Sequence, residues 1–183
     1  MDLILASSSP RRQMLLRQAG FTIKIVEPHI DEVIRPGESP DAYVTRLADE
    51  KSRVPSQEAI VVAADTSVVL DGEILGKPID EDDARQMLRR MSGRRHEVLT
   101  GFAVRKGTHL QVAVMKTGVT FRKLSHAEID AYLLTKEPFD KAGSYGIQAH
   151  GASLIDTIEG SFTNVIGLPL KEVIEAIHHA QSA

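Results

Sequence analysis

The chain has 183 residues, 42% of them hydrophobic and 26% charged, a balance typical of one ordinary globular domain and not of a disordered or fibrous protein. A formal net charge of −3 disfavours a dedicated binder of DNA or RNA, although it allows a local basic pocket. The sequence contains no cysteine, which excludes disulfides, thiol nucleophiles and cysteine-ligated zinc. We therefore expect a single domain over residues 1–183, with no nucleic acid polymer as its partner.

The start of the chain lacks the basic residues and the long apolar core of a signal peptide. No apolar run approaches the length of a membrane span. Nothing in the sequence addresses the protein elsewhere, so we expect a cytoplasmic protein that does not contact a membrane.

Strand and helix patterns alternate at the beginning of the chain. Leu3 to Ala6 is a short apolar run that predicts a buried strand. Pro10 suits the first turn of a helix, and Gly20 ends it. Residues 21–26 predict a second strand, and Ser39-Pro40 marks the start of a second helix.

The middle of the chain contains the clearest strand and a hairpin. Residues 59–64 are apolar throughout and predict a buried strand. Asp71-Gly72 is a tight-turn signal, which predicts a hairpin between residues 68–70 and 73–75. Residues 80–91 have apolar positions at helical spacing.

The last part of the chain adds two long strands and two helices. The strands are predicted near 97–105 and 110–121. Ser125 and Glu128 form a capping box for the next helix, and an apolar stripe from Leu170 to Ile177 predicts the last one. This order of elements predicts an α/β fold with a mixed sheet flanked by helices.

The first candidate site lies between the first strand and the first helix, where Ser7 to Pro10 lead into Arg11 and Arg12. Unpaired N–H groups and the positive end of the helix dipole favour an anion there. Two adjacent guanidinium groups offer forked donors that suit phosphate oxygens. The same residues are also common in an ordinary solvated helix start.

The second candidate site is Asp65-Thr66, which directly follows the apolar strand. Ligands of open α/β sheets bind beyond the carboxyl ends of strands. An aspartate at such a place could ligate Mg²⁺ or position an attacking water. A turn aspartate at the end of a strand is the alternative.

Other charged residues are weaker candidates. Lys77 lies between glycine and proline, where a fixed ammonium can neutralise a phosphate, and Asp80 is expected to cap the following helix. Lys51 and Glu32, taken singly, are expected to be solvated surface residues.

The segment from Glu137 to Gln148 is rich in small residues that let a ligand approach the backbone. Gln148 offers a donor and an acceptor, which suits the edge of a base, although a purely structural loop would also explain the glycines. The histidines show no metal-ligand spacing, and the sequence has no Walker A motif, dinucleotide fingerprint or nucleophile elbow.

Taken together, these segments resemble the Maf family of nucleoside triphosphate pyrophosphatases. The resemblance runs nearly from end to end, and six blocks in order are far more specific than any one of them. The blocks are ASSSPRR (6–12), ADT (64–66), LGKP (75–78), SGRRHEVLTG (92–101), DKAGSYGIQ (140–148) and GSFTNVIGLPL (160–170).

The resemblance implies a fold like that of the inosine triphosphate pyrophosphatases, with a curved mixed sheet, flanking helices and a cleft between two lobes. It implies hydrolysis of a nucleoside triphosphate to the monophosphate and pyrophosphate. The block around Gln148 is similar to the branch that acts on dTTP and UTP, although Ala149-His150 follows where that branch often has glycine. By this match Arg11, Thr66 and Gln148 would set specificity, and Asp65 would accept the proton.

Physical chemistry fits these roles. A carboxylate can orient and deprotonate water, while a divalent cation (Mg²⁺ or Mn²⁺) and basic side chains offset the charge of the triphosphate. Asp65 and Glu32 could hold the metal. Cations that could line the phosphate path are Arg11, Arg12, Lys51 and Lys77, the two lysines belonging with Asp65 to the expected catalytic set. The substrate is the expected partner, and a homodimer is compatible with this interpretation.

Two other functions use the same residues. A non-catalytic nucleotide-binding regulator of septum formation or cell division would keep Arg11 and Arg12 but lose the catalytic carboxylate. The presence of Asp65, Glu32 and Lys77 favours the enzyme. A nucleotidyltransferase also has an arginine-bearing loop after its first strand, but it would join the nucleotide to a sugar phosphate.

Overall fold

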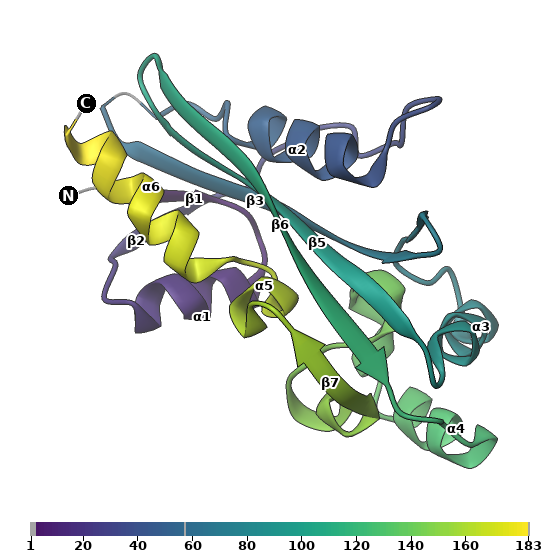
Figure 1. Ribbon diagram of the computed structural model, residues 1–183. Coiled ribbons are helices and arrows are strands. Elements are labelled where there is room, and N and C mark those ends of the chain that lie inside the picture. The colour runs from purple at the N-terminus through teal and green to yellow at the C-terminus, as the bar shows by residue number, and fades with distance from the viewer. Residues whose placement is uncertain (1–2, 57, 183) are drawn as a thin grey trace. The chain divides into compact units, whose positions relative to one another are not determined.

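The structure is a computed structural model that describes residues 3–56 and 58–182. Its strands form one open mixed sheet in the order β2-β1-β3-β5-β6-β7, with β4 paired to β3 (Figure 1). The strands are β1 (Leu3–Ala6), β2 (Ile23–Val26), β3 (Ile60–Leu70), β4 (Glu73–Leu75), β5 (Arg95–Lys106), β6 (His109–Phe121) and β7 (Ile155–Glu159). The helices are α1 (Pro10–Gln18), α2 (Pro40–Lys51), α3 (Glu81–Met91), α4 (His126–Leu134), α5 (Phe162–Ile166) and α6 (Leu170–Ser182). The predicted α/β class with a mixed sheet is confirmed.

The chain divides into two compact units. The first contains the described residues up to Thr66, together with Thr100–Met115 and those from Gly167 onward. The second contains Ser67–Leu99 and Lys116–Ile166. The extent of a single domain over residues 1–183 therefore stays a prediction.

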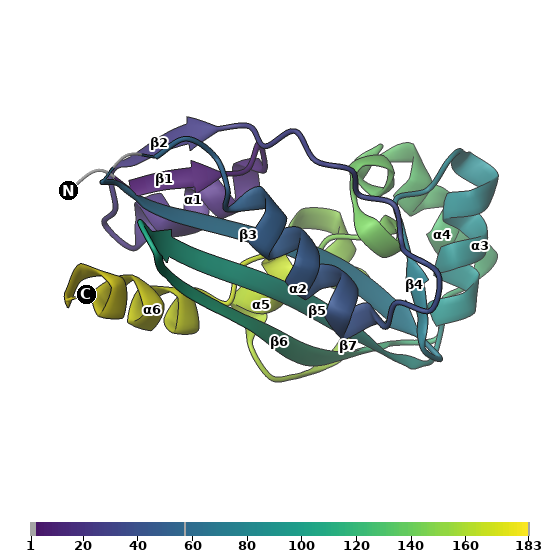
Figure 2. The ribbon, with the colours of Figure 1, turned by 90° about the horizontal axis from the view of Figure 1, so that it is seen from above.

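In the first unit, β1 pairs in parallel with both β2 and β3, so that Leu3 lies opposite Ile23 on one side and Ile60 on the other. Parallel strands covered on both faces are apolar throughout, which is why β1 and the start of β3 could be recognised in the sequence, whereas β2 is an edge strand that contains the exposed Lys24. Helices α1 and α2 lie on opposite sides of these strands (Figures 1 and 2).

Helix α2 packs closely against β5 within the first unit. A Cβ atom added to Gly101 would lie 2.2 Å from the carbonyl oxygen of Val44. Only glycine therefore lets the strand and the helix backbone approach this closely. The predicted start of α2 is confirmed, because the Ser39 hydroxyl accepts a hydrogen bond from the backbone N–H of Ala42.

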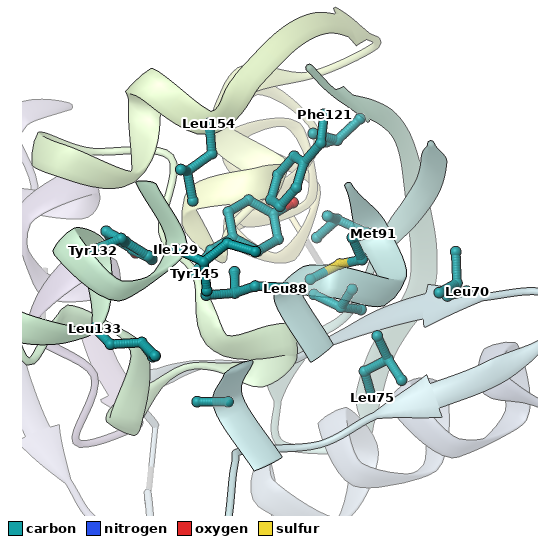
Figure 3. Packing of buried hydrophobic residues seen from close by; sticks show 14 residues of the cluster. Leu70, Leu75, Leu88, Met91, Phe121, Ile129, Tyr132, Leu133, Tyr145 and Leu154 are labelled. Carbon is teal, nitrogen blue, oxygen red and sulfur yellow. The ribbon is translucent and has the colours of Figure 1, made fainter. Parts of the chain in front are cut away.

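The second unit has its own hydrophobic core, in which α3 and α4 pack around aromatic residues (Figure 3). The predicted hairpin between β3 and β4 turns at Asp71-Gly72, where both residues have positive φ angles. The capping box of α4 is present as predicted, since the Ser125 hydroxyl accepts from the backbone of Glu128 and the Glu128 carboxylate accepts from the backbone of Ser125. None of the helices in the part of the chain that the structure describes is long and apolar enough to cross a membrane.

One sequence-based prediction about β3 is wrong. Asp65 and Thr66 do not follow the end of a strand, because β3 continues through them to Leu70. The Asp65 carboxylate is paired with a buried lysine, which offsets the cost of burying it, so this polar residue does not end the strand.

Candidate functional site

The centre of the candidate site in the first unit is the ammonium group of Lys51, in the last turn of α2. Its Nζ atom lies 2.7 Å from Oδ1 of Asp65 and 2.7 Å from Oε1 of Glu32. The Lys51 side chain is only 9% exposed, so the expectation that it is a solvated surface residue is wrong. A buried ammonium requires paired anions, and the carboxylates of Glu32 and Asp65 supply them.

Glu32 stands in the irregular segment between β2 and α2, and its side chain is 55% exposed, in agreement with the expected surface position. Helix α2 holds this segment. The Tyr43 hydroxyl donates to the carbonyl of Glu32 over 2.8 Å, and Nη2 of Arg46 donates to the carbonyl of Val33 over 3.1 Å. Burial raises the pKa of Tyr43 to about 12, and the charges of Asp65 and Glu32 add to the effect. Tyr43 therefore stays a donor at neutral pH.

Arg12 organises the other side of this site. Its Nε donates to the carbonyl of Gly167 over 2.7 Å, its Nη1 to the hydroxyl of Ser7 over 3.2 Å, and its Nη2 to Oγ1 of Thr66 over 3.0 Å. Thr66 Oγ1 also lies 2.9 Å from Oγ1 of Thr100, with which it shares a hydrogen bond. The contacts of Arg12 alone join three separate parts of the chain, around Ser7, Thr66 and Gly167, so Arg12 has a structural role beside any contact with phosphate.

The start of α1 is built as predicted for an anion site. Ser9 caps the helix by accepting from the backbone N–H of Arg12, Pro10 takes the first helical position, and the first turn has no acidic residue. Burial lowers the pKa of Arg12; the carboxylate of Asp65 opposes this, and the neighbouring charge of Arg11 adds to it. A further anion here would favour the charged form of Arg12.

Seven of the predicted site residues thus belong to the first unit: Ser7, Arg11, Arg12, Glu32, Lys51, Asp65 and Thr66. Lys77 and Gln148 belong to the second unit. There, the backbone N–H of Gly143 donates to the carbonyl of Gly76 over 3.0 Å, which ties the loop of Lys77 to the segment that leads to Gln148. Lys77 is exposed, and Gln148 is half-buried.

The carboxylates fit a divalent cation only in a limited way. Among residues 3–56 and 58–182 there is no group of three or more His, Asp or Glu side chains that could hold a metal. Mg²⁺, however, is commonly bound by one or two carboxylates together with substrate phosphates and water. Asp65 and Glu32, which share one ammonium, fit that arrangement.

Three contributors to the site had no clear signal of their own in the sequence. They are Tyr43, Thr100 and Gly167. Thr100 and Gly167 do lie within the blocks 92–101 and 160–170 on which the family resemblance rests. Tyr43 has no sequence signal because its partner is a carbonyl group in another segment.

Several known proteins are similar to this chain over nearly its whole length. The dTTP/UTP pyrophosphatase of Anaeromyxobacter dehalogenans is 51% identical, over 97% of this chain and 93% of its own. The proteins of the same name from Chromobacterium violaceum and Shewanella oneidensis are 51% and 46% identical, over 92% and 98% of this chain and 89% and 98% of their own.

Among solved structures, the Staphylococcus aureus Ham1 protein matches with a TM-score of 0.47 and 14% identity, over 85% of this chain and 80% of its own. The family described as Maf-like protein matches residues 2–180, a range that contains the whole candidate site. With relatives about half identical over nearly their full length, the chain belongs to the family of Maf-like proteins.

Proposed function

We propose that this protein hydrolyses dTTP and UTP to the nucleoside monophosphate and pyrophosphate. The observation that carries the proposal is the buried Lys51 ammonium, which holds the carboxylates of Asp65 and Glu32 in one place. The pyrimidine substrates are supported by relatives named dTTP/UTP pyrophosphatase that are 46–51% identical to this chain.

Asp65 is the proposed proton acceptor. Its Oδ1 is bound to Lys51, while Oδ2 has no hydrogen bond within the described part of the chain and so can accept one from water. Its position inside β3 supports this role, because a carboxylate on a strand is held more rigidly than one on a loop. Water attacks the α-phosphorus, the bond from that phosphorus to the bridging oxygen breaks, and Asp65 takes a proton of the water.

Cations offset the charge of the substrate. Arg11 and Arg12 at the start of α1 suit phosphate oxygens, and Lys51 and Lys77 complete the proposed set. Asp65 and Glu32 would hold a divalent cation such as Mg²⁺, which would neutralise part of the triphosphate charge when bound. The specificity positions of the proposal are Arg11, Thr66 and Gln148.

Gln148 is the proposed reader of the base. Its side chain makes no hydrogen bond within residues 3–56 and 58–182, so its carboxamide is available to a ligand. It can donate to a carbonyl oxygen of thymine or uracil and accept from N3–H, whereas cytosine presents a bare N3 and an amino group. A site built around the donor and acceptor of this carboxamide rejects a base that leaves either of them without a hydrogen bond.

The test uses the purified protein with UTP, dTTP, CTP and GTP and a divalent cation, in ¹⁸O-labelled water. We expect the monophosphate and pyrophosphate without a second substrate, with the label in the monophosphate. Asp65→Asn should lower kcat at least about a hundredfold, the usual range for loss of a general base. The matched control is Asp156→Asn, since Asp156 is an exposed residue of β7. This chemistry would be refuted by release of orthophosphate or by label in the pyrophosphate. It would also be refuted if the rate of Asp65→Asn stayed within about threefold of that of the starting protein.

A further inference from the structure

The segment that carries Gln148 forms a tight loop whose two ends touch. A Cβ atom added to Gly151 would lie 2.0 Å from the carbonyl oxygen of Gly146 and 2.8 Å from the hydroxyl of Tyr132. The same hydroxyl accepts a hydrogen bond from the backbone N–H of Gly146 over 3.2 Å. Residues 146–151, which we call the glutamine loop, therefore close on themselves with Gln148 in the middle.

Tyr145, immediately before the loop, is anchored in the core of the second unit. Its hydroxyl shares a hydrogen bond of 2.7 Å with Nε2 of His96, and its ring packs edge-on against Phe121 with a centroid distance of 4.7 Å (Figure 3). The N-terminal end of the glutamine loop is thus fixed by buried groups. The C-terminal end has to be held by other means.

A strained residue follows Gln148. Ala149 has a φ angle of 52°, in the left-handed region that glycine adopts freely and other residues avoid. The loop therefore needs a contact that compensates for the alanine.

The carboxylate of Glu137 supplies that contact. Its Oε1 accepts from the backbone N–H of His150 over 3.2 Å and lies 2.7 Å from Nδ1 of the same residue, while Oε2 accepts from the backbone N–H of Gly151 over 3.3 Å. The Glu137 side chain is 19% exposed, so these charge-assisted bonds are partly shielded from water. They hold the two residues that directly follow the strained alanine.

We infer that Glu137 is a positioning residue for base selection, holding the glutamine loop in the shape that presents Gln148 to the substrate. The inference rests on the proposed reading of the base by Gln148. Glu137 itself need not touch the nucleotide. Its substitution should therefore change the preference among nucleotides without abolishing hydrolysis.

The decisive variant is Glu137→Gln, which keeps the size of the side chain but places an amide N–H₂ where one accepting oxygen stood. We expect kcat/KM for UTP and dTTP to fall about tenfold, while that for CTP changes less than about threefold. The matched control is Glu159→Gln, because Glu159 is an exposed residue that pairs with the exposed Arg95. The control should keep the UTP-to-CTP ratio of the starting protein.

A second variant tests the link to the strained residue. Adding Ala149→Gly to Glu137→Gln places glycine at the left-handed position, so that the loop no longer depends on the carboxylate. The double variant should regain most of the UTP-to-CTP ratio. Three results would each overturn the inference. Glu137→Gln could leave the UTP-to-CTP ratio within about twofold of the starting protein, it could lower activity equally on all nucleotides, or Ala149→Gly could fail to restore the ratio.

Amide hydrogen exchange measured by NMR gives a readout that does not depend on activity. Glu137→Gln should speed the exchange of the His150 and Gly151 amides about tenfold, and unchanged exchange would overturn the inference. Gln148→Ala, assayed in parallel, separates the two proposals. If it loses UTP-over-CTP preference while Glu137→Gln does not, only the role of Glu137 fails. If it loses activity equally on all nucleotides, the reading of the base fails, and the inference falls with it.

Discussion

The buried histidine of the second unit should make the stability of the protein depend on pH. His96 is 2% exposed, and burial lowers its pKa to about 4 from the ordinary 6.5, with the charge of Arg95 adding to the effect. The unfolded chain therefore binds a proton at a higher pH than the folded one. The stability that neutral His96 contributes is fully present above about pH 6.5 and is lost as the pH falls towards 4. Between pH 7 and pH 5 the protonation of His96 should lower the free energy of unfolding by about 2 kcal/mol.

The assay is urea unfolding at several pH values between 7 and 5, compared between the starting protein and His96→Gln. The glutamine amide can donate to the Tyr145 hydroxyl or accept from it, but it cannot take up the proton. Other titrating groups are common to both proteins, so the difference in slope isolates His96. The free energy of unfolding of the variant should fall by about 2 kcal/mol less over this interval. Parallel curves would show that His96 does not titrate differently in the folded and unfolded chains, and would refute the reasoning.

Two further predictions concern the candidate site. Lys51→Met should destabilise the protein by about 3 kcal/mol, because it leaves the buried Asp65 carboxylate without its cation; adding Asp65→Leu should recover most of that loss. Urea unfolding of the single and double variants measures both effects, and a loss below about 1 kcal/mol in the single variant would contradict the importance of the pair. Thr66→Val should cost about 1 kcal/mol and raise KM for UTP, since it removes the acceptor of Arg12 and the partner of Thr100. Unfolding and initial-rate measurements equal to those of the starting protein would count against this network.

The local parts of the fold could be predicted from the sequence. The turn at Asp71-Gly72 and the capping box of Ser125 and Glu128 depend on residues at most three positions apart, and both are present. Their geometry is set by short-range hydrogen bonds and φ preferences, which the residue types specify directly.

The parts that depend on distant partners could not be predicted in the same way. Lys51 was expected on the surface because a lysine seldom lies buried, and the partners that permit its burial come from a loop and a strand. For the same reason Asp65 was placed after a strand that in fact continues through it. Thr100 lies in the apolar central part of β5, and its contact with Thr66, 34 positions away in the sequence, appears only once the chain is folded.

The contact between Gly101 and α2 helps to determine the position of the Lys51 ammonium, which lies at the other end of that helix. A methyl group at Gly101 would stand 2.2 Å from the Val44 carbonyl oxygen, where ordinary contact begins near 3.4 Å, so the helix would have to move by about 1 Å. An α-helix is stiff along its axis, and Lys51 lies only two turns farther along α2. Such a shift would reach the ammonium almost undiminished and would change its 2.7 Å contact with Asp65, which stands on the separate strand β3. Because Gly101 has no side chain, β5 and α2 can pack closely, and this close packing fixes the position of the Lys51 ammonium at the end of the helix.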